Sequence, residues 1–164
     1  MKPAPPPIPA SLLRDPGHFL ALGFGSGLAP RAPGTFGTLA AIPVYLLCAQ
    51  LASPAYLLVV AGLFLLGVYL CGRTARSLGV HDHPGIVWDE VVGFLLTMAF
   101  APPGWWWIVL GFAAFRLFDI WKPWPIRVLD RRVHGGLGIM LDDVLAGLAA
   151  AASLEILYRL LQNV

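Results

Sequence analysis

Two long stretches of this chain contain no Asp, Glu, Lys or Arg: residues 32–72, a run of 41, and residues 91–115, a run of 25. Charged residues make up about a quarter of an ordinary soluble domain, whereas here they make up 12% beside 58% hydrophobic residues. A chain with so few charges cannot cover a surface in water and requires lipid around it. Because helices satisfy their own backbone groups inside a bilayer, we predict an all-α integral membrane protein.

Turn signals within the apolar stretches predict how many helices form. We expect helices over residues 38–52, 54–71, 91–100, 105–118 and from about 142 to 161. Ser53 with Pro54, and the run of Pro102, Pro103 and Gly104, are typical of turns and would join the first four helices into two hairpins. The third and fourth segments, with 10 and 14 residues, are short for a hydrocarbon core of about 30 Å. They therefore either tilt, or enter the bilayer and return.

The predicted domain organisation is simple. Residues 12–164 form one membrane-embedded domain of about four to five helices, arranged as two hairpins plus a C-terminal helix, after a flexible proline-rich tail at residues 1–11. Residues 12–28 are apolar enough to lie in the membrane interface or to enter it. A net charge of +2 is too small to indicate a nucleic-acid partner.

The distribution of cations predicts which helix ends face the cytoplasm. Neither expected hairpin tip, at residues 52–54 and 101–104, carries a charge. The opposite ends carry Arg31, Arg73, Arg76, Arg116, Lys122, Arg127, Arg131 and Arg132. Because cytoplasmic loops of membrane proteins are enriched in Lys and Arg, we expect these charged ends to face the cytoplasm.

Five of the nine acidic residues lie at the ends of the apolar segments. Asp89 and Glu90 open the third expected helix, Asp119 ends the fourth, and Asp142 and Asp143 open the fifth. All five fall at the expected cytoplasmic ends. Ionisable groups at the edge of hydrocarbon mark sites for ions or substrate, and gathered carboxylates are ligands of hard divalent cations such as Mg²⁺. The simpler alternative is that the acidic pairs only favour the positive end of a helix dipole.

Segments near these acids supply candidate phosphate contacts. Gly34 and Thr35 lie in a stretch rich in glycine, proline and hydroxyl groups, where backbone amides can approach a phosphate. The alternative for this stretch is a hinge of small residues that pack closely. Lys122, just after the fourth helix, would hold a phosphate oxygen with Arg116 or Arg127 beside it, unless this loop is only a cationic anchor.

Three further polar residues are expected to surround the ligands of the metal rather than to bind it. His81 and Asp82 precede Asp89 by a few residues, and in a loop such residues are more often solvated or placed behind the ligands. Asp130 lies among three arginines and is expected to pair with them.

Four strings of the sequence stand out together. They are residues 23–43 with Ala32-Pro33-Gly34-Thr35, residues 81–93 with Val87-Trp88-Asp89-Glu90, residues 115–127 with Lys122-Pro123-Trp124-Pro125, and residues 133–147 with Asp142-Asp143. In this order they resemble the phosphatidylglycerophosphatase A family of bacterial inner-membrane lipid phosphatases. The resemblance covers most of residues 18–150. Thr38 stands where the family pattern leads us to expect Ser, a change that keeps the hydroxyl group.

The resemblance implies Mg²⁺-dependent hydrolysis of the terminal phosphate of phosphatidylglycerol phosphate, at the cytoplasmic face of a bacterial inner membrane. We expect Asp89, Glu90, Asp119, Asp142 and Asp143 to hold one or two Mg²⁺ ions, with one carboxylate as general base. Metal-activated water is the favoured nucleophile, because the chain contains no Asp-x-Asp pair and no Ser-Gly-His triplet. Direct attack by a carboxylate is left open. The lipid substrate and the bilayer are the expected partners.

A small membrane transporter that uses helix-end carboxylates is the alternative from another class. Its deepest ionisable residue would be Glu155, although Arg159 lies four residues later and can pair with it. A lipid-headgroup transferase fits less well, because the string Asp142-Asp143-Val144 does not match the Asp-x-x-Asp-Gly arrangement of such enzymes.

Overall fold

The computed structural model describes residues 6–81, 83–124 and 126–163, without the side chains of residues 129–131. Within these residues the protein is helical and contains no strand, which confirms the predicted all-α class. The elements are η1 (Leu12–Arg14), α1 (Pro16–Ala21), η2 (Gly23–Leu28), α2 (Pro33–Cys48), α3 (Ser53–Leu78), α4 (Trp88–Met98), α5 (Trp105–Trp121), α6 (Ile126–Arg132) and α7 (Gly135–Gln162). Residues 12–28, whose depth the sequence left open, form the three short elements η1, α1 and η2.

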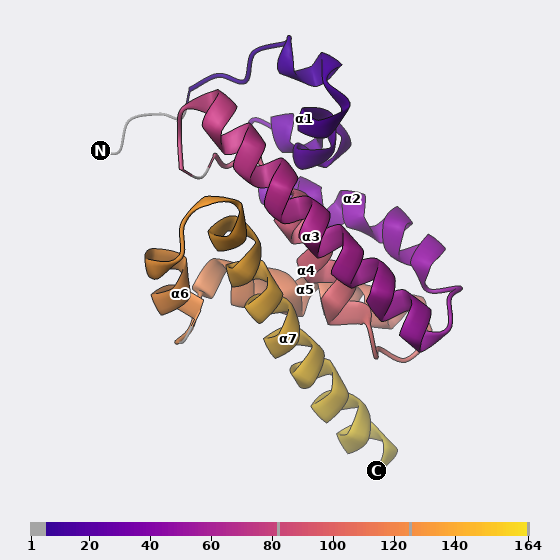
Figure 1. Cartoon of the computed structure of the whole chain (residues 1–164). Helices are drawn as coiled ribbons and strands as arrows, with labels where there is room; N and C mark the ends of the chain where they lie inside the picture. Colours follow the sequence, from indigo (N-terminus) through magenta and orange to yellow (C-terminus); the bar gives the residue numbers. More distant parts are fainter. Residues whose placement is uncertain (1–5, 82, 125, 164) are drawn as a thin grey trace.

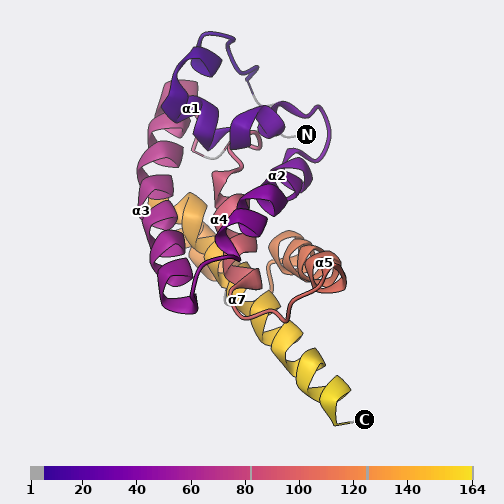
Figure 2. The same cartoon turned by 90° about the vertical axis from the view of Figure 1, so that its right-hand side faces the viewer.

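Helix α7 is the element around which the others are arranged. It packs against α3, α4, α5 and α6, while α4 packs against α2, α3 and α5 (Figure 1). The consecutive helices α2 and α3 make few contacts with each other, because α4 lies between them (Figure 2). The first expected hairpin is therefore held together largely through α4.

A contact between glycines lets α4 and α7 approach closely. A Cβ atom added to Gly147 on α7 would lie 2.5 Å from the carbonyl oxygen of Gly93 on α4. The hydroxyl of Thr97 donates to this same oxygen at 2.9 Å and lies 3.4 Å from the carbonyl oxygen of Gly147. Small residues that permit backbone contact are typical of helix interfaces in membranes. This contact brings the beginning of α4 next to the first half of α7.

Several helices begin or end elsewhere than the sequence predicted. Helix α2 begins at Pro33 rather than at residue 38 and contains Pro43 in its interior. Helix α3 continues to Leu78 rather than ending at residue 71. Helix α7 begins at Gly135, so the expected start at Asp142 was wrong. The glycine run at its start is helical because tertiary packing outweighs low helix propensity: Gly136 lies directly against the carbonyl oxygen of Val68.

The extra turns of α3 hold α1 in place. The Asp15 carboxylate accepts hydrogen bonds from the backbone of Gly17 and His18 and so caps α1. Two guanidinium nitrogens of Arg73 on α3 donate to the same carboxylate at 2.9 and 2.6 Å. These bonds lower the pKa of Asp15 to about 2, chiefly through Arg73. His18, which is buried, lies 2.9 Å from the Thr74 hydroxyl, and desolvation lowers its pKa.

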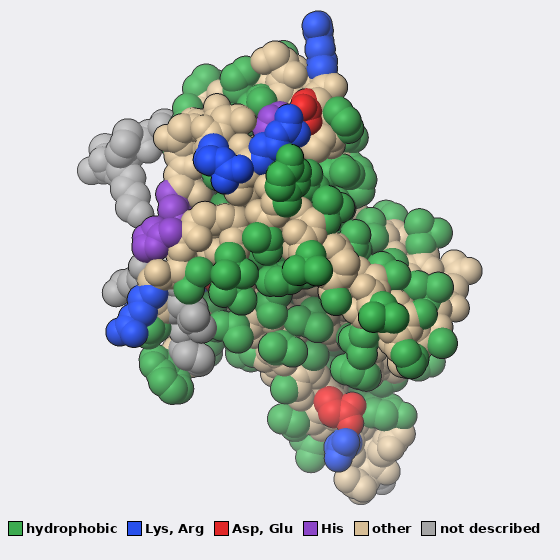
Figure 3. Space-filling view, in the orientation of Figure 1, with side chains coloured by type: hydrophobic (Ala, Val, Ile, Leu, Met, Phe, Trp, Pro, Cys, Tyr) green, Lys and Arg blue, Asp and Glu red, His purple; other side chains and the backbone are tan. Residues whose placement is uncertain are grey.

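Two helices, α3 and α7, are long and apolar enough to cross a membrane by length and composition. At 1.5 Å per residue, the 26 residues of α3 extend about 39 Å, which exceeds a hydrocarbon core of about 30 Å. Hydrophobic side chains cover much of the flank of the molecule, and its Lys, Arg and His side chains on that face lie mostly toward the end with α1 and α6 (Figure 3). Apolar patches of this extent mark surfaces that contact a partner or lipid.

Candidate active site

One cavity of about 360 Å³ contains all five carboxylates that the sequence singled out. It lies where α2 and α4 begin, α5 ends and α7 completes its first turns, and we call it the acidic cavity. Its lining comprises Ala32, Pro33, Gly34, Pro84, Ile86, Asp89, Glu90, Arg116, Asp119, Ile120, Lys122, Asp142 and Asp143. Among the described residues that line the cavity, five carboxylates face two cationic side chains, which is a formal excess of three negative charges.

The helices present these carboxylates from three different positions. Asp89 and Glu90 lie in the first turn of α4, as predicted, where the helix dipole favours negative charge. Asp142 and Asp143 do not open α7: they lie about two turns inside it, beyond the reach of the dipole. The dipole argument was therefore wrong for this pair. Asp119 lies in the last turn of α5, where the dipole is unfavourable and a cation must compensate.

Arg116 supplies that compensation. Its Nη1 atom lies 2.6 Å from Asp119 Oδ2 and 3.8 Å from Glu90 Oε1, and its side chain is only 14% exposed. Nη1 is also 3.5 Å from the hydroxyl oxygen of Thr38, a hydroxyl that donates to the carbonyl oxygen of Gly34 at 2.9 Å. In the sequence analysis, Thr38 stood out only as a departure from the family pattern. Its spacing of four residues from Gly34, which suits a helical hydroxyl-to-carbonyl bond, is the signal that could have placed it here.

Lys122 joins the end of α5 to α7. Its ammonium group forms an ion pair with Asp142. Its backbone is left-handed, with φ of 44°, and its N–H donates to the carbonyl oxygen of Phe118 to close the helix. A non-glycine residue in this conformation costs about 1–2 kcal/mol, and such strain is found at functional sites. The chain thus accepts backbone strain at the residue that places an ammonium group in the cavity.

Gly34 brings the beginning of α2 against the carboxylates. A Cβ atom on Gly34 would overlap Glu90 Oε1 and lie 3.1 Å from Arg116 Nη1. Only glycine therefore permits this contact without moving the Glu90–Arg116 pair.

The carboxylates form two groups that meet the distances of a metal site. Asp89, Asp142 and Asp143 offer oxygens within 4.8 Å of one another, and so do Glu90, Asp119 and Asp143. Oxygens on opposite sides of a Mg²⁺ ion at about 2.1 Å lie about 4.2 Å apart, so either group closes on an ion through small side-chain movements. Asp143 belongs to both groups.

The burial of these carboxylate oxygens also favours a metal site. Asp143 is 2% exposed, and within the described part of the protein its Oδ2 atom and Glu90 Oε2 are buried without a hydrogen-bond partner. Buried acceptors without partners are costly, and several buried negative charges repel one another. A hard divalent cation would satisfy these oxygens and relieve the repulsion, so the residues present fit such an ion.

Other predicted residues are not among the described residues that line the acidic cavity. Arg127 is exposed on α6, and Thr35 does not line the cavity. His81 lies at a separate hollow beside Arg76, where its Nε2 atom accepts from the backbone N–H of Gly135 at 3.2 Å. Asp82 and the side chain of Asp130 lie outside the described residues. Pro84 and Ile86, which line the cavity, carried no chemical signal in the sequence.

An acid-rich cavity with two cations beside it is typical of enzymes that act on phosphate with the help of a metal. The family model for phosphatidylglycerophosphatase A matches residues 19–158. The chain therefore belongs to the phosphatidylglycerophosphatase A family, as the sequence motifs led us to expect, and it is a phosphatase.

Curated relatives agree with this assignment. The chain is 52% identical over 143 residues to phosphatidylglycerophosphatase A of Escherichia coli, covering 87% of this chain and 83% of the relative. It is 49% identical over 146 residues to the Haemophilus influenzae protein of the same name, covering 88% and 90%. A Bacteroides thetaiotaomicron relative, 37% identical over 136 residues and covering 78% and 84%, is named provisionally as a phosphatidylinositol-3-phosphatase. No solved structure matches the chain.

Proposed function

We propose that this enzyme hydrolyses the terminal phosphomonoester of phosphatidylglycerol phosphate and releases phosphatidylglycerol and inorganic phosphate. The observation that carries the proposal is the acidic cavity, which combines five carboxylates with Arg116 and Lys122. The names of the Escherichia coli and Haemophilus influenzae relatives, which match most of the chain, support this particular substrate.

The enzyme acts at the cytoplasmic face of a bacterial inner membrane in this proposal. Helices α3 and α7 have the length and composition of membrane spans, and large apolar side chains are exposed on α3, α5 and α7. The acidic cavity lies at the end of α5 from which the basic helix α6 follows. Enrichment of cytoplasmic ends in Lys and Arg favours this orientation, and it would meet a lipid phosphate at the membrane surface.

Mg²⁺ is the cation that we propose for the cavity. Asp89, Asp142 and Asp143 would hold one ion, and Glu90 and Asp119 with Asp143 have the spacing to hold a second. When bound, the ion neutralises phosphate charge, orients the group and makes a bound water more acidic.

The remaining chemistry belongs to the side chains of the cavity. Lys122 and Arg116 line it, and each carries several N–H donors with which it would bind phosphate oxygens as negative charge shifts during transfer. Gly34 leaves room for a phosphate to approach the start of α2. A cavity carboxylate accepts a proton from the attacking water. The water oxygen bonds to phosphorus as the bond between phosphorus and the glycerol oxygen breaks, and the leaving oxygen takes up the proton that the carboxylate accepted.

The test is phosphate release from phosphatidylglycerol phosphate in detergent micelles, measured with Mg²⁺ and with EDTA. We expect turnover in Mg²⁺ that EDTA abolishes and that Asp142→Asn removes while the variant remains folded. Glu155→Gln, on the same helix but outside the cavity, should keep wild-type turnover. Absence of turnover by the wild-type enzyme with any divalent cation would refute the proposed substrate, and turnover unaffected by EDTA would refute the metal.

A further inference from the structure

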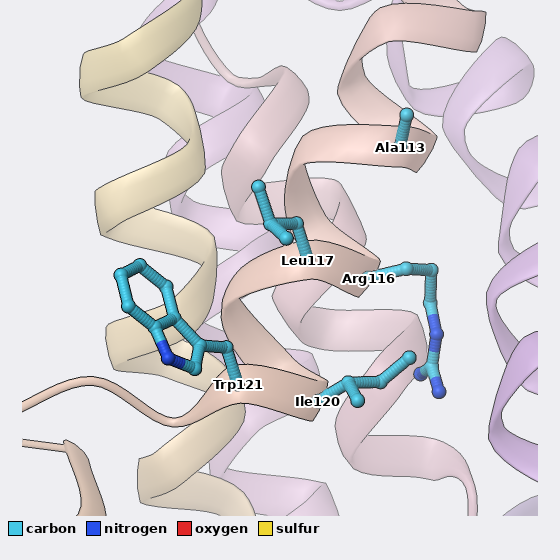
Figure 4. Close-up of a pocket in the computed structure, with 5 residues that line it drawn as sticks. All are labelled: Ala113, Arg116, Leu117, Ile120 and Trp121. Atoms are coloured by element: carbon cyan, nitrogen blue, oxygen red, sulfur yellow. The ribbon is translucent and has the colours of Figure 1, made fainter.

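A second hollow, of about 850 Å³, lies on the outer face of α5 beside the acidic cavity. Five residues line it: Ala113, Arg116, Leu117, Ile120 and Trp121 (Figure 4). Ala113, Leu117 and Trp121, spaced by four, form one ridge along the helix, and Arg116 with Ile120 forms the neighbouring ridge. The hollow is the groove between these ridges, and we call it the α5 groove.

The α5 groove leads into the acidic cavity. Arg116 and Ile120 line both, and in Figure 4 their side chains lie on the side of α5 away from Leu117 and Trp121. The aliphatic stem of Arg116 borders the groove, while its guanidinium group pairs with Asp119 at 2.6 Å. Long cationic side chains often divide an apolar from a polar region in this way. The exposed apolar residues of α3, in contrast, line no part of the acidic cavity.

We propose that the α5 groove binds an acyl chain of the lipid whose phosphate is hydrolysed in the acidic cavity. This inference rests on the proposed function. A phosphate headgroup joined to an apolar tail matches, in order, a cavity that carries Arg116, Lys122 and the proposed cation and that continues through Arg116 and Ile120 into an apolar groove. The groove extends from Trp121 to Ala113, which is about 12 Å along the helix. Leu117, Ile120 and Trp121 are exposed there and offer methyl groups and an indole ring to the chain.

The groove contributes to positioning more than to affinity. An acyl chain already lies in apolar surroundings before it binds, so it gains no hydrophobic transfer free energy on entering the groove. What it gains is van der Waals contact and a fixed register, and that register holds the phosphate at the carboxylates. Residues distant from the chemistry, such as Ala113, should therefore affect turnover of long-chain substrate.

The test compares Ala113→Phe, which fills the far end of the groove, with Ala61→Phe, which places the same side chain at an exposed alanine on α3. Turnover is measured in mixed micelles with dioleoyl and dihexanoyl phosphatidylglycerol phosphate, because the short chains end before they reach Ala113. We expect Ala113→Phe to lower kcat/KM for the dioleoyl form about tenfold relative to the dihexanoyl form. Ala61→Phe should leave this ratio unchanged.

If Ala113→Phe does not change the ratio of kcat/KM between the dioleoyl and dihexanoyl forms, acyl-chain binding in the α5 groove is refuted. The phosphatase assignment would remain intact. Wild-type enzyme that releases phosphate from neither substrate would instead refute the proposed function. A direct measurement avoids variants altogether: a dioleoyl substrate analogue with a photoreactive group on one chain should label residues 113–121 of the wild-type protein, and excess unlabelled substrate should suppress this labelling. Labelling that is spread evenly over the apolar surface would contradict the proposal.

Discussion

The two halves of α7 carry acidic residues in opposite surroundings. Asp142 and Asp143, in its first half, are buried, and among the described residues they share the acidic cavity with three further carboxylates and two cationic side chains. Glu155, in its second half, is 41% exposed and pairs with Arg159 one turn later at 2.7 Å, as their spacing predicted. Among the described residues, the same helix therefore has an excess of carboxylates at one end and a balanced ion pair at the other.

This difference separates a functional carboxylate from a structural one. An exposed pair on a helix contributes only about 0.3–0.5 kcal/mol, and nothing around it requires a ligand. Buried carboxylates that outnumber their cations destabilise the fold unless a cation binds or some of them take up protons. The deepest candidate residue of the transporter alternative, Glu155, is therefore paired with its own cation, Arg159.

The largest expected effect distinguishes the acidic residues in the first half of α7 from Glu155 in its second half. Asp143→Asn removes a carboxylate from both candidate metal groups, so we expect turnover to fall by about a thousandfold, the scale seen when one electrostatic group is lost from an active site. Glu155→Gln should stay within about twofold of wild type, since only a surface pair is lost. Steady-state phosphate release measures both. Similar losses in the two variants would show that burial and charge excess do not identify the site.

Lys122 extends the comparison to the cations that pair with the acidic residues of α7. The backbone of Lys122 is strained, whereas Arg159 lies in a regular helix. Lys122→Ala and Lys122→Gly both remove the ammonium group, and each should lower turnover about a hundredfold. Glycine adopts the left-handed conformation without strain, so we expect Lys122→Gly to be more stable than Lys122→Ala by about 1 kcal/mol. Thermal unfolding measures the difference. Equal stability of the two variants would mean that the backbone relaxes.

Glycine substitutions extend the comparison to the backbone. Gly34→Ala places a methyl group against Glu90 Oε1, and displacement of a site by about 1 Å can reduce turnover about a hundredfold. Gly62→Ala on α3 meets nothing within 4 Å and should stabilise the protein by about 0.5–1 kcal/mol with normal turnover. Activity and thermal unfolding of both variants test this. Full activity of Gly34→Ala would show that the start of α2 does not shape the site.

The smallest effect concerns Asp15, which pairs with Arg73. Its side chain is more exposed than the acidic residues in the first half of α7 and less exposed than Glu155 in the second half. Since the pKa of Asp15 is lowered from 3.8 to about 2 in the folded protein, the pair stabilises the fold above 3.8 and loses this effect as the pH falls toward 2. We expect Asp15→Asn to unfold at a slightly lower temperature than wild type at neutral pH. The gap should close over that acidic range, and a gap independent of pH would contradict the ionic origin.

The sequence predicted the helical class and the set of five carboxylates because both follow from where polar residues interrupt apolar segments. The prediction from sequence failed where tertiary contacts determine the helix boundaries and the neighbours of a residue. Helix α7 begins at Gly135 because its glycines pack against α3, which no local propensity reveals. Arg127 and His81 were assigned to the site from proximity in sequence, yet Arg127 is exposed on α6, His81 lines a separate hollow, and neither is among the residues that line the acidic cavity. The role of Gly34 depends on a contact with Glu90, 56 residues later.

The most direct test of this account is the effect of Mg²⁺ on the unfolding temperature of the detergent-solubilised protein. A cation that binds only the folded state at about 100 times its Kd stabilises it by about 2.7 kcal/mol. We predict that Mg²⁺ raises the unfolding temperature of wild type and of Glu155→Gln, and that Asp143→Asn shows no increase. An increase of the same size in Asp143→Asn, or none in wild type, would contradict the claim that the acidic cavity holds a divalent cation.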